Sequence, residues 1–247
     1  MEDAFQKATQ IIKSVKENGA TLRLIGGLAV KKFCNKLEFC ERDHGDIDLV
    51  GLSQESQQII KTMTDLGYKE NEDYTLASSG HRFLFELPDS HDHVDIFLDK
   101  LWMEHDIDLR KRLHIEDITI PVSDLLVCKL IVKDLTEKDY RDIVTLVKDL
   151  EFGTEDLPSI INLNYISKLC SDSWGLYHDI LESIDECIAF LETYHFEEAV
   201  SQEIASKFNL MRTAIIEHPK SAKWKLRSSV GERYHWRKRV ELESVER

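Results

Sequence analysis

The sequence lacks the features that mark several large classes of protein. None of its apolar runs approaches the roughly 20 residues that a membrane span needs. The chain starts acidic and turns amphipathic, unlike a secretory signal. Its five cysteines include no CxxC pair and are odd in number, which is typical of reduced thiols. We therefore expect a cytoplasmic protein without a membrane partner.

Common catalytic signatures are missing as well. The sequence contains no Walker-type phosphate loop, no dinucleotide-binding fingerprint and no nucleophile elbow of a Ser-His-Asp hydrolase. It also shows no internal repeat and no low-complexity segment. Its chemistry must therefore be sought in other patterns.

The charge is strongly acidic but unevenly distributed. The formal net charge is −14, which as a whole repels nucleic acid. Residues 220–239 hold eight Lys or Arg and one acid, a net +7, which leaves −21 on the remainder. This basic tail interleaves cations with aromatic residues, a composition that suits contact with RNA. The other interpretation, which the acidic remainder favours, is that the tail docks on the chain's own acidic surface or is disordered.

The hydrophobic pattern changes its period along the chain. At 247 residues and 42% hydrophobic content the chain can form a real core. Helices are predicted over 4–18, 28–39 and 53–66, and strands over 22–25, 47–51, 82–87, 94–98 and 118–122. From residue 123 the pattern is helical, over 123–132, 137–150, 155–170, 173–191 and 194–217. The pattern indicates an α/β unit followed by an all-helical half, with the junction near 152–153.

A glycine pair and two carboxylates stand in the first part of the chain. Gly26 and Gly27 lie between a strand and a helix, where a phosphate can approach backbone N–H groups. Asp46 and Asp48 lie two residues apart at the next strand and therefore point to the same side. Such close like charges repel unless a cation lies between them. The pattern predicts a site for a metal–nucleoside triphosphate.

A third carboxylate, Asp95, lies on a later strand among apolar neighbours. A lone carboxylate is unfavourable there unless it is paired or bound to metal. Three convergent carboxylates suit two Mg²⁺ (or Mn²⁺) ions, which hold a triphosphate, stabilise pyrophosphate as it leaves and activate an acceptor hydroxyl. Asp95 could also accept the proton of that hydroxyl.

Several blocks, in this order, resemble a known group of enzymes. They are Leu24 to Val30, Arg42, Asp46 to Leu49, Val94 to Ile96, Val122 to Leu130 and Lys138 to Ile143. Over about residues 20–150 the chain resembles the DNA polymerase β-type nucleotidyltransferase superfamily, and most of all the branch of AbiEii-type toxins and minimal or antibiotic nucleotidyltransferases. The resemblance implies an α+β protein. Residues 1–150 would form a catalytic domain with a small mixed sheet flanked by helices, and residues 151–247 an all-α domain with a basic tail.

The resemblance also implies roles for the candidate residues. Gly26 and Gly27 would shape the triphosphate loop, Asp46 and Asp48 would bind the metal, and Asp95 would complete the triad. Many members carry Ser or Thr at the position after the glycine pair, where this chain has Leu28.

Four further residues take supporting roles by the same resemblance. Arg42 would approach phosphate or position the loop, and Lys129 would contact phosphate or an inward-facing carboxylate. Asp139 and Asp142 are three residues apart on one helical face and would orient Lys129 or the acceptor.

The function expected is a Mg²⁺-dependent nucleotidyltransferase. It would move NMP from an NTP to a hydroxyl or phosphate on a small molecule, an RNA end or a protein, and release pyrophosphate. The alternative is a non-catalytic module that binds a nucleotide or a partner, for example a toxin–antitoxin component.

Two further patterns near the site have two interpretations each. One is the run His91, Asp92 and His93, which either binds zinc or forms a polar hairpin loop. The hairpin loop is favoured, because no further ligand stands at the spacing of a structural zinc site. Arg82 either reaches the triphosphate or is an exposed strand residue.

Overall fold

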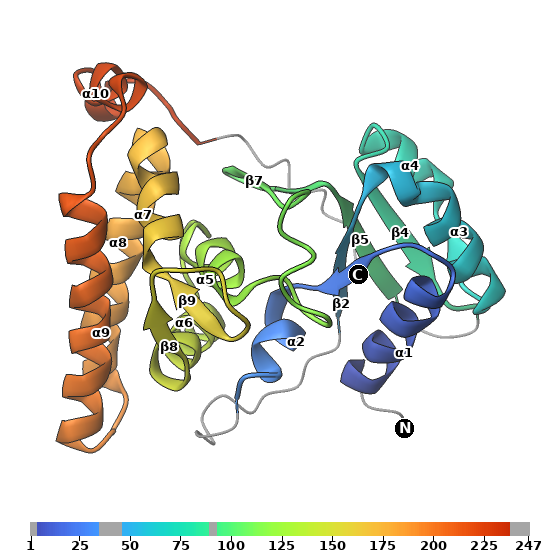
Figure 1. The fold of residues 1–247 in the computed structure, drawn as a ribbon, viewed down its shortest axis with the longest axis horizontal. Coiled ribbons are helices and arrows are strands. Elements are labelled where there is room, and N and C mark those ends of the chain that lie inside the picture. Colours follow the sequence, from blue (N-terminus) through green and yellow to red (C-terminus); the bar gives the residue numbers. More distant parts are fainter. Residues whose placement is uncertain (1–3, 35–45, 89–92, 238–247) are drawn as a thin grey trace.

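The computed structural model describes residues 4–34, 46–88 and 93–237 and has a mixed α+β fold (Figure 1). The strands are β1 (Leu22–Leu24), β2 (Ile47–Gly51), β3 (Lys69–Glu70), β4 (Arg82–Glu86), β5 (His93–Leu98), β6 (Lys100–Trp102), β7 (Asp106–Asp108), β8 (Glu151–Gly153) and β9 (Ile160–Asn162). The α-helices are α1 (Ala4–Glu17), α2 (Gly26–Lys31), α3 (Ser56–Asp65), α4 (Glu72–Ala77), α5 (Val122–Leu130), α6 (Glu137–Asp149), α7 (Leu163–Asp172), α8 (Trp174–Phe190), α9 (Glu198–Glu217) and α10 (Ala222–Ser228).

The central sheet has five strands in the order β1-β2-β5-β4-β3. Strands β2 and β5 run parallel, and the other neighbours run antiparallel. Figure 1 shows α1 and α3 on one side of the central strands, and α2 with the later helices on the other. The expected α+β class, with a small mixed sheet followed by a helical part, is confirmed.

The helical stripes predicted from the sequence form the core of the helical part. Ile180 and Ile184 of α8 are fully buried, as are Phe208 and Met211 of α9. Helices α5 and α6 contact α2 on one side and α8 on the other. They therefore join the sheet part to the helical part through a continuous apolar core.

The structure differs from the predicted elements between residues 118 and 162. Residues 118–122 form a single parallel bridge, Leu24 to Thr119, in place of a strand. The helix expected over 155–170 begins only at Leu163, and β8 and β9 form a small parallel sheet before it. Pro158 accounts for this difference, because the residue before a proline avoids the helical conformation.

The structure bears on the expectations about membrane spans and cysteines. Among the described residues, no helix is both apolar enough and long enough to cross a membrane. Cys128, Cys170 and Cys187 are buried thiols, as the cysteine pattern predicts.

Candidate active site

Two of the three predicted carboxylates lie on neighbouring strands, and the third directly precedes one of them. Asp48 of β2 and Asp95 of β5 are register partners in the parallel pair. Neighbouring strands lie about 4.8 Å apart, and partners in register project to the same face. Asp46 comes directly before β2, and its Oδ1 lies 3.6 Å from Nε2 of His93, the first residue of β5. The fold therefore gathers all three carboxylates on one face of the sheet.

Gly26 packs directly against one of these carboxylates. Its φ of +70° is a left-handed conformation that favours glycine. A Cβ at this position would lie 2.5 Å from Oδ2 of Asp48. The amide of Ile25 donates to the Asp48 carbonyl at 2.9 Å, which fixes the start of α2 beside β2. Glycine is therefore required here both for the turn and for the close approach of the carboxylate.

The electrostatics of the triad are those of concentrated negative charge. Burial, and then repulsion from Asp95 and Asp46, raises the pKa of Asp48 to about 6. The positive charges of Lys129 and Arg82 act in the opposite direction. Deprotonating Asp48 is thus costly unless more positive charge enters the site.

Lys129 and Asp142 form an ion pair behind the triad. Nζ of Lys129 on α5 lies 2.8 Å from Oδ2 of Asp142 on α6, and both side chains are largely buried. Asp139 has a different place, because it closes a capping box with Thr136 at the start of α6. The structure therefore places Lys129 and Asp142 together near Asp48, and assigns Asp139 to the helix end.

Arg82 is a site residue whose partner the sequence did not reveal. Its Nε donates to Oδ1 of Asp95 at 2.6 Å, and its Nη2 donates to Oδ2 of the same carboxylate. The guanidinium lies over the ring of Phe97, 4.3 Å from the centroid. Arg82 thus reaches the triad by holding one of its members.

Three of the sequence-based candidates lie outside the described residues. They are Arg42, for which a phosphate contact was expected, and His91 and Asp92 of the histidine loop. His93 lies within the described part and contacts Asp46.

The chemistry of the triad fits a hard divalent cation. All the candidate ligand atoms are carboxylate oxygens, which Mg²⁺ and Mn²⁺ prefer. Burial and the two neighbouring carboxylates raise the pKa of Asp48, and a bound cation would offset both effects. Asp46, Asp48 and Asp95 are thus the residues that would hold the metal, at the place where the glycine turn brings the backbone closest.

Two cavities lie away from the triad. The larger, of about 590 Å³, is lined by His105, Asp106, Ile107, Asp108, Arg110, Lys111, Arg112, Tyr165, Leu169, Asp172, Ser173, Leu176 and Lys223. The smaller, of about 220 Å³, lies between α8 and the loop before α6, and Arg237 lines it. Neither cavity is lined by a member of the triad, so neither identifies an acceptor.

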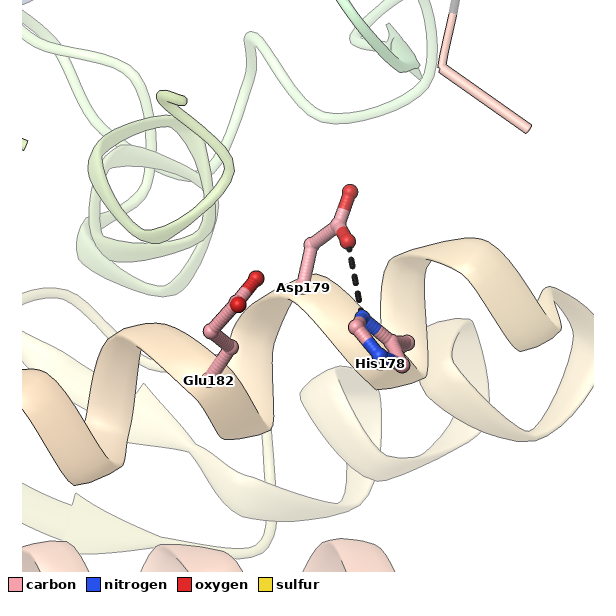
Figure 2. A group of neighbouring side chains, drawn as sticks. All are labelled: His178, Asp179 and Glu182. Atoms are coloured by element: carbon pink, nitrogen blue, oxygen red, sulfur yellow. Dashed lines mark hydrogen bonds and ion pairs between the residues drawn. The ribbon is translucent and has the colours of Figure 1, made fainter. Parts of the chain in front are cut away.

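A second group of metal-ligand types lies on α8. His178, Asp179 and Glu182 have ligand atoms that all lie within 4.8 Å of one another, and Figure 2 shows His178 paired with Asp179. Asp179, however, also accepts hydrogen bonds from Trp236 and Arg237. This group is therefore occupied by protein donors and anchors the tail.

The basic tail is docked on the chain as far as residue 237. Trp236 fits against Gly175, where a Cβ would lie 2.4 Å from its ring, and Trp224 packs edge-on against Tyr177. Of the tail's rings, Tyr234 is strongly exposed, at 72%. The expectation of docking on the chain's own acidic surface is confirmed for Trp236 and Arg237, and RNA contact stays a prediction.

Comparisons with solved structures find five chains similar to this one, two of which are described below. No protein-family model and no curated protein matches the chain. The lincosamide antibiotic adenylyltransferase LnuA, bound to lincomycin, is 20% identical with a TM-score of 0.43, over 59% of this chain and 97% of that one. The antibiotic-resistance factor ANT(2'')-Ia is 13% identical with a TM-score of 0.40, over 77% of this chain and 97% of that one. The first neighbour is thus described as an antibiotic adenylyltransferase and the second as an antibiotic-resistance factor.

Proposed function

We propose that the chain is a metal-dependent nucleotidyltransferase that moves NMP from an NTP to a hydroxyl or phosphate acceptor and releases pyrophosphate. The observation that supports this best is the in-register pair of Asp48 and Asp95 with Asp46 beside it. Mg²⁺ or Mn²⁺ bound to these carboxylates would stabilise the charge that develops on the phosphates.

The chain's own residues would divide the remaining work. The acceptor oxygen attacks the α-phosphorus of the NTP, and the bond from that phosphorus to the oxygen leading to the β-phosphate breaks. Pyrophosphate leaves with the electron pair of that bond. The proton of an acceptor hydroxyl passes to a carboxylate of the triad, for which Asp95 is the candidate.

The acceptor that the charge distribution favours is a small cationic molecule. The net charge is −14, which attracts cations and repels RNA. Trp224 and Trp236 pack inside the chain and are not free to stack on bases. The experiment below therefore tests an RNA end and a protein side chain as the other acceptors.

The test is a labelling assay with each of the four NTPs and Mg²⁺. The acceptors offered in parallel are an aminoglycoside, a polyamine, an RNA oligonucleotide and the chain itself. We expect transfer of label with release of pyrophosphate. Asp46→Asn and Asp48→Asn should each lower it by more than about 100-fold, because losing a residue that only supports a metal ligand already costs about 10- to 100-fold.

The matched control is Asp65→Asn, which changes an exposed aspartate on α3 that pairs with Lys61. Its activity should equal that of the wild type. If activity survives both triad substitutions, the metal assignment is wrong. If the wild type binds an NTP but never turns it over, the chain is a binding module.

A further inference from the structure

Arg82 is held more firmly beside the triad than a surface arginine. It donates two hydrogen bonds, one to each oxygen of Asp95. Its guanidinium also lies over two rings, 4.3 Å from the centroid of Phe97 and 5.4 Å from that of Tyr74. Bidentate pairs of this kind are the stronger class of ion pair in proteins. Arg82 thus has a defined place, set by β4, β5 and α4.

This pairing decides what Asp95 can do. Both of its oxygens are engaged by Arg82, at the place where a cation would otherwise be bound. Among the described residues, Asp46, Asp48 and Asp95 do not form a group whose ligand atoms all lie within 4.8 Å, whereas the α8 group does. Asp95 therefore directs both of its oxygens to Arg82.

Arg82 is also accessible enough to exchange Asp95 for another partner. Its side chain is 36% exposed, whereas that of Asp95 is 11% exposed. Its Nη1 has no hydrogen-bond partner among the described residues. Through its unused donor, a partly exposed guanidinium can make a first contact with an incoming phosphate before it leaves Asp95.

We propose that Arg82 is an internal counter-charge that occupies the place of a divalent cation at Asp95. Arg82 leaves Asp95 when a triphosphate binds and its guanidinium pairs with the phosphate oxygens instead. The chain without nucleotide then binds a cation through Asp46 and Asp48 alone, and Asp95 becomes a ligand only after the nucleotide. This inference rests on the proposed function, and it gives Arg82 two successive partners, Asp95 and then the triphosphate.

The test is binding of Mn²⁺ alone, without nucleotide, measured by electron paramagnetic resonance on the full chain. In the wild type, Asp95→Asn should leave the Mn²⁺ affinity unchanged, whereas Asp48→Asn should abolish binding. Arg82→Gln should raise the Mn²⁺ affinity about tenfold, because it removes the charge-assisted hydrogen bonds to Asp95 and leaves that carboxylate available to the ion. Adding Asp95→Asn to Arg82→Gln should cancel that gain.

Arg110→Gln is the matched control, because Arg110 makes a similar bidentate pair with Asp108 on β7, outside the triad. It should leave Mn²⁺ affinity unchanged. If Arg82→Gln does not fold, Arg82→Lys replaces it. A lysine ammonium lacks the planar pair of donors that matches the two oxygens of Asp95, so it should hold Asp95 less firmly and several-fold tighter Mn²⁺ binding is expected.

Two results would overturn the inference. One is an Mn²⁺ affinity that Arg82→Gln does not change although Asp48→Asn abolishes binding. That result would refute this inference and leave the proposed metal site standing. The other is an Asp95→Asn variant of the wild type that loses Mn²⁺ as severely as Asp48→Asn does. If the wild type binds no Mn²⁺ at all, the proposed function fails together with this inference.

Discussion

Substituting Gly26 separates the backbone role of this residue from its role beside the carboxylate. Gly26→Ala adds a Cβ at a φ of +70° and 2.5 Å from Oδ2 of Asp48. The left-handed conformation alone costs about 1–2 kcal/mol for a residue with a Cβ. For a chain of this length, that corresponds to a Tm lower by about 2–8 °C. The contact with Asp48 adds a second effect, because the carboxylate must move aside.

Gly67→Ala is a matched control for the backbone term. Gly67 has a φ of +90°, and a Cβ there would meet nothing within 4 Å. Both variants should therefore lose about 1–2 kcal/mol of the free energy of unfolding, measured by urea denaturation. Only Gly26→Ala should also weaken Mn²⁺ binding, by about tenfold or more, since a metal site tolerates little displacement of a ligand.

The outcome that would refute the reasoning is specific. If Gly26→Ala binds Mn²⁺ and nucleotide as tightly as Gly67→Ala does, the carboxylate of Asp48 is not held by the glycine turn as the structure indicates. A loss of stability alone, equal in the two variants, would reduce Gly26 to a turn residue.

Three further predictions follow from buried charges. Asp48 keeps its proton to about pH 6 when folded but only to about pH 3.8 when unfolded, so the metal-free chain should lose stability as pH rises between these values. Burial raises the pKa of Asp124 to about 6 as well, so the loss of stability between about pH 4 and about pH 7, measured by urea unfolding, should be smaller in Asp48→Asn than in the wild type. Asp179→Ala leaves Arg237 without its buried partner, so it should cost about 3 kcal/mol and expose the tail to limited proteolysis. Lys129→Met removes the cation paired with buried Asp142 and should cost about 3 kcal/mol of the free energy of unfolding, measured by urea denaturation. Adding Asp142→Asn should restore this stability, but it should not restore nucleotide turnover if Lys129 contacts the triphosphate.

Local patterns predicted much of the sheet and of its carboxylates. The strand 47–51 is found at the predicted residues, and the hairpin of β4 and β5 joins the two predicted strands. Asp48 lies within the strand 47–51 and Asp46 directly before it. The adjacency of β2 and β5 did not follow from these patterns, because strands far apart in the sequence pair through the whole fold; it was expected only from the family resemblance.

The partners of individual charges were harder to predict. Arg82 meets Asp95 because the hairpin register sets Leu84 opposite Asp95 and places Arg82 one step along the same face. Nothing local to either residue fixes that register. Asp139 is different, since Thr136 three residues before it is a recognisable capping signal that could have assigned it to the helix end.

A comparison of Asp179 with the triad shows how a structural site differs from a candidate active site. Asp179 is 4% exposed and accepts hydrogen bonds from His105, Trp236 and Arg237, which hold its pKa well below the usual range. Such a group is fully satisfied and has no capacity left for a ligand. The triad shows the opposite shift, because burial and neighbouring carboxylates raise the pKa of Asp48. Of these two places, the triad is therefore the one where negative charge is not fully compensated in the folded chain. The energetic cost of that charge is tolerated at a site where an incoming cation removes it.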